Sequence, residues 1–118
     1  MQRYLHLALA FAMVFSSGCY YDKEELLYPG ACNPGNASVP GYWAEMVEPI
    51  IAARCTSCHQ PGGQGPGDLR TYAAVKAIVD NGSFRQLVLI SRSMPQGGAL
   101  TPCEIQKLQA WVDAGAPN

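Results

Sequence analysis

The chain has 118 residues, a length that fits a single domain. Eight Lys and Arg stand against nine Asp and Glu, so no strongly basic surface is expected and nucleic-acid binding is excluded as a function class. Twelve glycines and nine prolines predict many turns and short helices, with little room for a large sheet and a small side-chain core.

Residues 1–18 have the layout of a secretory signal. Arg3 precedes an apolar run over residues 7–15, which is too short to span a bilayer as a helix. The end of this stretch, "FSSGC", resembles a bacterial lipobox, in which cleavage before Cys19 leaves a lipidated cysteine. We therefore expect an exported bacterial lipoprotein on the periplasmic side of the inner or outer membrane, or at the cell surface. The alternative is an ordinary cleaved signal that leaves a spare thiol at Cys19.

Residues 19–41 are polar and rich in Gly, Pro and Asn, which predicts a tether and an extended segment. A domain over residues 42–118 follows, and apolar residues at helical spacing predict that it opens with an amphipathic helix running up to Cys55. Pro49 interrupts this helix, which either kinks there or begins its regular part there. The apolar face of the helix consists of Trp43, Met46, Val47, Ile50 and Ile51.

The stretch "RCTSCHQPGG", residues 54–63, carries the predicted chemistry. On one helical turn the thiols of Cys55 and Cys58 project from the same side, so each can reach one vinyl group at the edge of a haem. The pattern C-x-x-C-H is the signature of c-type haem attachment, and His59 is then the proximal iron ligand. Loss of residues 1–18 also removes His6, which leaves His59 as the only histidine of the mature chain.

Three other interpretations of this motif compete with covalent haem. A zinc site needs a fourth ligand, for which the sequence offers Cys32 or Cys103. A thioredoxin-like redox pair requires a βαβ pattern, which is absent around the motif. A structural disulfide or a chance occurrence is the remaining interpretation. Covalent haem is preferred because the histidine directly follows the second cysteine.

The glycine-rich stretch "QPGGQGPGDL" over residues 60–69 is either a flexible linker or a segment whose backbone lies against a flat ligand. The stretch 71–82 predicts a short helix with Thr71 as its cap, and residues 83–90 fit either a helix or an extended strip. The last helix is the clearest, because Thr101, Pro102 and Glu104 form a capping box with proline in the first turn. Candidates for a haem wall, each of which could equally be plain core, are Tyr72, Val75, Leu87, Val88, Ile90 and Trp111.

Met94 is the expected sixth ligand of the iron. No second histidine remains in the mature chain, and Met46 lies on the helix that leads into the attachment motif. Met94 lies 35 residues after His59, where Pro95 holds it out of helical geometry and lets a loop present the sulfur from the opposite side. The alternative is a surface or core methionine, with the sixth position open or bound by water.

Cys32 and Cys103 remain after the lipid anchor and the haem motif are assigned. Thiols in an oxidising compartment are normally bonded, so we expect these two to form a disulfide. The bond would join the extended N-terminal segment to the start of the last helix.

The segments "CTSCH", "TYAAVKAIVDNG" and "MPQGGALTPCEIQKLQAWVDAGAP", together with the glycine loop, resemble a small single-haem c-type cytochrome of class I over residues 42–118. The last of these segments is similar to exported lipoprotein cytochromes with an extra cysteine at the start of the final helix. The resemblance implies an all-α, cytochrome c-like fold of few short helices and long Gly/Pro-rich loops around one covalent haem. It also implies that Cys55 and Cys58 are the anchors, and His59 and Met94 the axial ligands.

We therefore expect an electron carrier, not an enzyme, with no catalytic residue of its own. Its partners would be a redox donor and acceptor and, through Cys19, a membrane. A methionine ligand suits this role because it raises the reduction potential. The alternatives are a peroxidase-like enzyme or a gas sensor with an open sixth position, for which Arg92 is the only distal candidate. A zinc-binding or purely structural lipoprotein is a further alternative.

Overall fold

A computed structural model of the protein describes residues 32–118. The expected signal peptide, the lipidation site at Cys19 and the first part of the tether lie outside the described residues. Within residues 32–118, no helix has the length and apolar character needed to cross a membrane.

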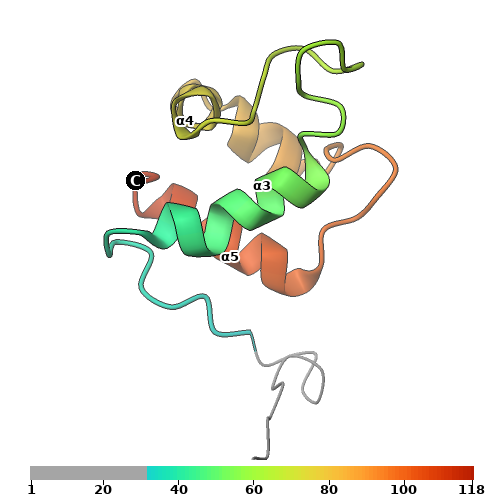
Figure 1. Ribbon diagram of the computed structural model, residues 1–118. Helices are drawn as coiled ribbons and strands as arrows, with labels where there is room; N and C mark the ends of the chain where they lie inside the picture. The colour runs from blue at the N-terminus through green and yellow to red at the C-terminus, as the bar shows by residue number, and fades with distance from the viewer. Residues whose placement is uncertain (1–31) are drawn as a thin grey trace, which may run out of the picture.

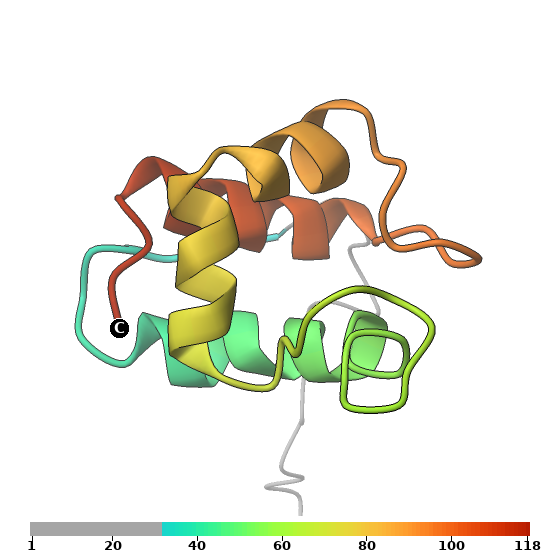
Figure 2. The ribbon, with the colours of Figure 1, turned by 90° about the horizontal axis from the view of Figure 1, so that it is seen from above.

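The described part of the chain is helical and contains no strand, which confirms the all-α prediction for these residues. Both views show α3 and α5 running in opposite directions, with α4 crossing near one end of the pair (Figures 1 and 2). Helix α5 contacts both η1 and η2. The elements in chain order are the π-helical η1 (Trp43–Val47), α3 (Glu48–Arg54), α4 (Tyr72–Asp80), the π-helical η2 (Arg85–Ile90) and α5 (Pro102–Asp113).

The first helix has the predicted buried face, and the structure shows where Pro49 lies in this helix. A π-helical stretch over η1 continues directly into α3, and Pro49 lies in the first turn of α3. A proline is tolerated there because the first backbone N–H groups of a helix have no partner within the helix. The regular α-helix therefore begins around Pro49. Its buried residues are Trp43 and Val47 from η1 and Ile50 and Ile51 from α3.

The two capped helices form as predicted. The Thr71 side chain accepts a hydrogen bond from the N–H of Ala74 at 3.3 Å, which fixes the start of α4. At α5 the box is complete: Thr101 accepts from the N–H of Glu104 at 3.2 Å, and the Glu104 carboxylate accepts from the N–H of Thr101 at 2.7 Å. Residues 83–90, which the sequence allowed to be either a helix or an extended strip, contain the helix η2.

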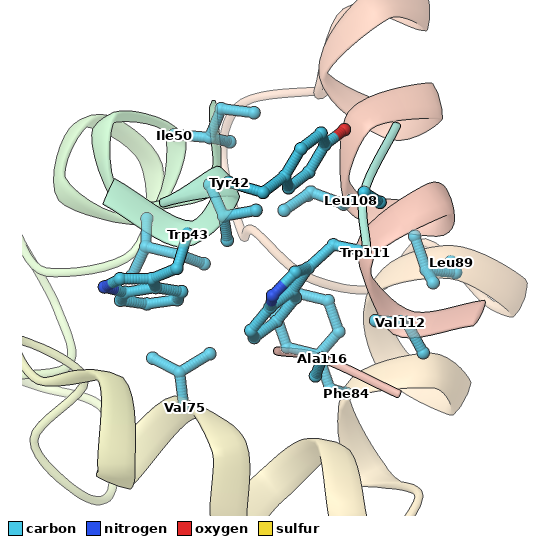
Figure 3. Packing of buried hydrophobic residues seen from close by; sticks show 13 residues of the cluster. Tyr42, Trp43, Ile50, Val75, Phe84, Leu89, Leu108, Trp111, Val112 and Ala116 are labelled. Carbon is cyan, nitrogen blue, oxygen red and sulfur yellow. The ribbon is translucent and has the colours of Figure 1, made fainter. Parts of the chain in front are cut away.

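Aromatic rings form the centre of the core. The ring centroids of Trp43 and Trp111 are 5.2 Å apart, and Tyr72 and Phe84 contact them edge-on at 5.4 and 6.4 Å. Val75 projects toward this cluster from α4 (Figure 3). Val75 and Trp111 are fully buried among protein side chains, so these two candidates for a haem wall belong to the core of the polypeptide.

An ion pair joins the ends of the two antiparallel helices. The Nε of Arg54, the last residue of α3, lies 2.9 Å from a carboxylate oxygen of Glu104 in the first turn of α5. Burial alone would raise the pKa of Glu104, but hydrogen bonds from Thr101 and Arg54 outweigh it, so the pKa is lower than usual. Arg54 directly precedes Cys55, so the ion pair lies at the end of α3 where the C-x-x-C-H motif begins.

We expect Glu104→Gln to lower the free energy of unfolding by about 1 kcal/mol at pH 7, a modest value because the Arg54 side chain is 37% exposed. A folded-state pKa below the ordinary value of 4.5 means that the contribution is full above that pH and is lost as the pH falls through the folded value. Urea unfolding at pH 7 and in acid measures both. The exposed Glu45→Gln is the control, and a deficit that persists unchanged in acid would contradict the ion-pair account.

Candidate functional site

Cys55 and Cys58 lie at the end of α3 and in the turn that follows it. Cys55 is the C-terminal cap of α3, and its N–H donates to the carbonyl of Ile51 at 2.9 Å. Both thiols are free; Cys55 is half-buried against the core and Cys58 is exposed. Burial raises the pKa of the Cys55 thiol to about 11, so this thiol is protonated near neutral pH.

The turn holds the three motif residues close together. The N–H groups of Cys58 and His59 both donate to the carbonyl of Cys55, at 3.2 and 3.0 Å. The chain then folds back, because the N–H of Gly65 donates to the carbonyl of Cys58 and the N–H of Leu69 donates to the carbonyl of His59, both at 3.0 Å. Backbone hydrogen bonds within the turn and from the following loop therefore hold the C-x-x-C-H motif in place.

The imidazole of His59 has one nitrogen engaged by the backbone. Nδ1 lies 2.7 Å from the carbonyl oxygen of Pro66. A carbonyl oxygen only accepts hydrogen bonds, so Nδ1 donates to it, and in the neutral imidazole the lone pair is on Nε2. Such a hydrogen bond fixes both the tautomer and the ring orientation of a metal-ligating histidine.

Two glycines allow the loop to approach the motif closely. A Cβ atom at Gly65 would lie 2.7 Å from Cε1 and 2.9 Å from Nδ1 of His59, and one at Gly63 would lie 2.1 Å from the carbonyl oxygen of Cys58. Of the two interpretations of this loop, the structure therefore favours close backbone contact over a free linker. In the polypeptide itself, the flat group that the backbone contacts is the imidazole of His59.

Gly65→Ala should displace the His59 ring, because the new methyl group has to fit where ring atoms now lie. We expect a loss of about 1–3 kcal/mol in the free energy of unfolding, as for other overpacking substitutions. The matched control is Gly98→Ala, where a Cβ atom meets nothing within 4 Å. Thermal unfolding of the two variants beside the wild type measures the effect, and equal stability of G65A and G98A would disprove the steric argument.

Met94 lies in the loop between η2 and α5. The residue is half-buried, its N–H donates to the carbonyl of Leu87 at 3.1 Å, and the Met94–Pro95 peptide bond is cis. Both ribbon views show this orange loop and the yellow-green loop after α3 at the same end of the molecule (Figures 1 and 2). Met46, the other methionine considered, packs against the hydrophobic core from η1.

Two large apolar side chains of η2 are exposed just before the Met94 loop. Leu87 is 43% and Ile90 63% exposed, and both were candidates for a haem wall. Within residues 32–118, Val39 is the only other large hydrophobic side chain that is exposed. They leave apolar surface available to a ligand at this end of the domain.

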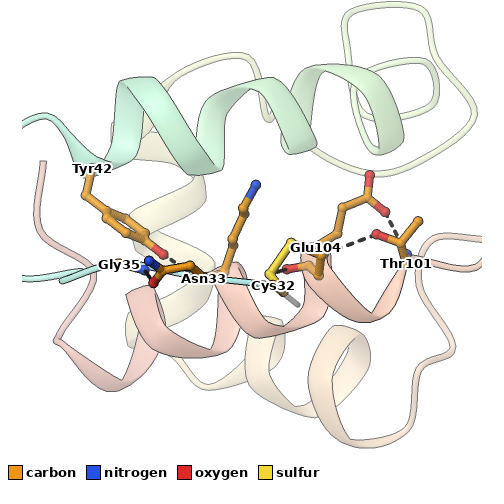
Figure 4. Close-up of a disulfide and its surroundings, with 8 residues drawn as sticks. Cys32, Asn33, Gly35, Tyr42, Thr101 and Glu104 are labelled. Atoms are coloured by element: carbon orange, nitrogen blue, oxygen red, sulfur yellow. Dashed lines mark hydrogen bonds between the residues drawn. A yellow bond between two sulfur atoms is a disulfide. The ribbon is translucent and has the colours of Figure 1, made fainter. Parts of the chain in front are cut away.

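The structure joins Cys32 to Cys103 in a disulfide beside the first turn of α5 (Figure 4). The bond closes a segment with a sequence separation of 71 residues. In the chain-entropy model, a loop of this length corresponds to a stabilisation of roughly 4 kcal/mol. The bond fixes the N-terminal segment to the same helix end that carries Glu104.

The sequence did not predict two contacts at or beside the site, between Pro66 and His59 and between Arg54 and Glu104. Pro66 supplies the acceptor for His59, and its role depends on the path of the glycine loop, which no periodicity reveals. Arg54 and Glu104 are 50 residues apart, so only the packing of α3 against α5 brings them together. The capping pattern at Thr101 predicts the hydrogen bond between the Glu104 carboxylate and the Thr101 N–H, but not the second partner of that carboxylate.

No family model, no curated protein and no solved structure matches the chain. Within residues 32–118, no group of three or more His, Cys, Asp or Glu side chains is placed to hold a metal ion by itself.

Proposed function

We propose that the protein is a single-electron carrier that holds one haem c on Cys55 and Cys58, with His59 and Met94 as axial ligands. The observation that carries this proposal is the state of His59. Its Nδ1 is engaged by the Pro66 carbonyl and its ring is backed by Gly65, so Nε2 is the nitrogen free to bind a metal.

The thiols fit the attachment chemistry. A thioether forms when a thiol adds across a vinyl double bond: a carbon–sulfur bond is made, the S–H proton goes to the neighbouring carbon, and no oxidant is required. Cys55 and Cys58 are both free thiols, and Cys55 keeps its proton near neutral pH. The apolar surfaces of Leu87 and Ile90 suit a porphyrin better than water.

The haem would supply a one-electron iron couple, and the chain would set its environment. His59 is already oriented by a backbone hydrogen bond, which lowers the cost of ordering it when iron binds. Met94, in a loop at the same end of the domain, is the sixth ligand that we propose. A filled sixth position leaves no site for a substrate on the iron, which favours electron transfer over catalysis.

The zinc alternative is weakened by the disulfide. That site needs further ligands beyond Cys55, Cys58 and His59, and the cysteines considered for it, Cys32 and Cys103, are bonded to each other. The alternative of an open iron depends on Arg92 as a distal group. Arg92 is exposed, and His59, the only histidine of residues 32–118, is the iron ligand in this proposal and so is not available as a distal base.

We also propose that the mature chain begins at a lipidated Cys19 and acts on the periplasmic side of the inner or outer membrane, or at the cell surface. Its partners would be a redox donor and a redox acceptor. These parts of the proposal rest on the signal-like residues 1–18 and on the resemblance to exported lipoprotein cytochromes.

Carbon monoxide distinguishes the carrier from a haem enzyme or gas sensor. The reduced protein at neutral pH should bind carbon monoxide slowly and to a small extent, because the Met94 sulfur must first leave the iron. Absorbance spectra recorded after mixing measure this. Rapid and complete binding would favour an open sixth position, while the haem assignment itself would stand.

A further inference from the structure

We infer that the Cys32–Cys103 disulfide determines which end of the domain faces the membrane, by making the chain leave the domain beside the haem-attachment motif. This inference rests on the proposed lipid at Cys19 and deepens the proposed function. It assigns a role to a disulfide that electron transfer itself does not require.

The path of the N-terminal segment carries the first step. From Cys32, beside the first turn of α5, the chain runs along that helix to Tyr42, the residue before η1 (Figures 1 and 4). Trp43 of η1 packs against Trp111 in the last part of α5, whereas Arg54 at the end of α3 pairs with Glu104 in the first turn. Tyr42 and Cys55 therefore lie at opposite ends of the first helix, about 18 Å apart for 12 helical residues.

The second step concerns what holds this segment. Its hydrogen bonds include local ones within turns. The N–H of Gly35 donates to the Asn33 side chain, and the N–H of Ser38 donates to the Asn36 side chain, both at 3.0 Å. Ala37 is buried but small, and Tyr42 is the first large side chain of the described residues that is buried. The disulfide is thus the covalent bond that ties residue 32 to α5.

The third step is the reach of the tether. Cys32 lies 13 positions after Cys19, so an intact disulfide limits the distance from the lipid to the domain to about 45 Å. If Tyr42 were the first fixed residue, 23 residues would span up to about 80 Å and would leave from the opposite end.

Cys103 is next to Glu104, which binds Arg54, which precedes Cys55. The tether therefore leaves the domain at the end where the haem motif and the Met94 loop lie. The partner class that fits this arrangement is a redox protein seated in the same membrane, within the reach of the short tether.

The inference can be tested on the full lipidated protein in vesicles of phosphatidylethanolamine and phosphatidylglycerol that contain a lipid with a photoreactive headgroup. Cross-links are mapped by mass spectrometry. In the wild type they should be several-fold more frequent on residues 60–69 and 91–100 than on residues 113–118. In a Cys32→Ser/Cys103→Ser variant that retains its helical circular dichroism, this preference should fall at least twofold.

A second variant keeps the disulfide and inserts 12 Gly/Ser residues before Cys32, which should weaken the preference without changing the domain. An unchanged cross-link pattern in both variants, or a wild-type preference for residues 113–118, would overturn the inference. Haem content and acyl mass are measured on the same samples. A colourless protein with the expected cross-link pattern would refute the haem proposal but not the inferred orientation. A haem protein with a uniform cross-link pattern would refute the orientation but not the haem proposal.

Discussion

Replacing both Cys55 and Cys58 by alanine should abolish covalent haem in protein expressed with a cytochrome c maturation system. Each thioether needs its own sulfur, and the two thiols are the only free ones among residues 32–118. A denaturing gel stained for haem measures the result: a strong band for the wild type and none for the double variant.

The control for this experiment is Cys32→Ser/Cys103→Ser, which removes two cysteines but leaves the haem motif intact. That variant should still stain, although its Tm should fall by roughly 15–30 °C because a loop constraint of roughly 4 kcal/mol is lost. Haem that remains bound to the Cys55→Ala/Cys58→Ala protein after denaturation would show that attachment occurs elsewhere.

Met94→Ala should remove the sixth ligand, with the largest expected effect on the spectrum and the potential. Loss of a thioether ligand should abolish the weak near-red absorption of a sulfur–iron bond in the oxidised protein. The reduction potential should fall by on the order of 0.1 V or more, since axial ligands set potentials over a range of roughly 0.8 V. Spectra and a redox titration of the purified protein measure both.

Met46→Ala is the matched control, because Met46 is the other methionine of the described residues and packs against the core. Met46→Ala should lower the free energy of unfolding by at most about 5 kcal/mol and should leave the near-red band in place. If M46A loses the band and M94A keeps it, the assignment of the sixth ligand is wrong.

The sequence allowed the local features of the fold to be predicted. Thr71 and the box of Thr101 and Glu104 mark helix starts because their side chains satisfy backbone groups within three residues, so chain neighbours suffice to identify them. The buried face of the first helix followed from periodicity alone. The helical state of η2 could not be predicted, because its spacing is compatible with both a helix and a strand and the packing against α5 decides.

The candidate site could be predicted only where it is contiguous. Cys55, Cys58 and His59 lie in one five-residue motif, so their proximity needs no tertiary information. The contact of Gly65 with the imidazole and the acceptor role of Pro66 depend on how the loop folds back. The pairing of Cys32 with Cys103 was reached by elimination among five cysteines rather than from any spacing.

The mass of the intact secreted protein tests the central claim most directly. The proposal predicts the mass of the chain from Cys19, with its acyl groups and one haem, and this haem should stay bound after unfolding in acid and organic solvent. A colourless polypeptide with the mass of the acylated chain alone would contradict it.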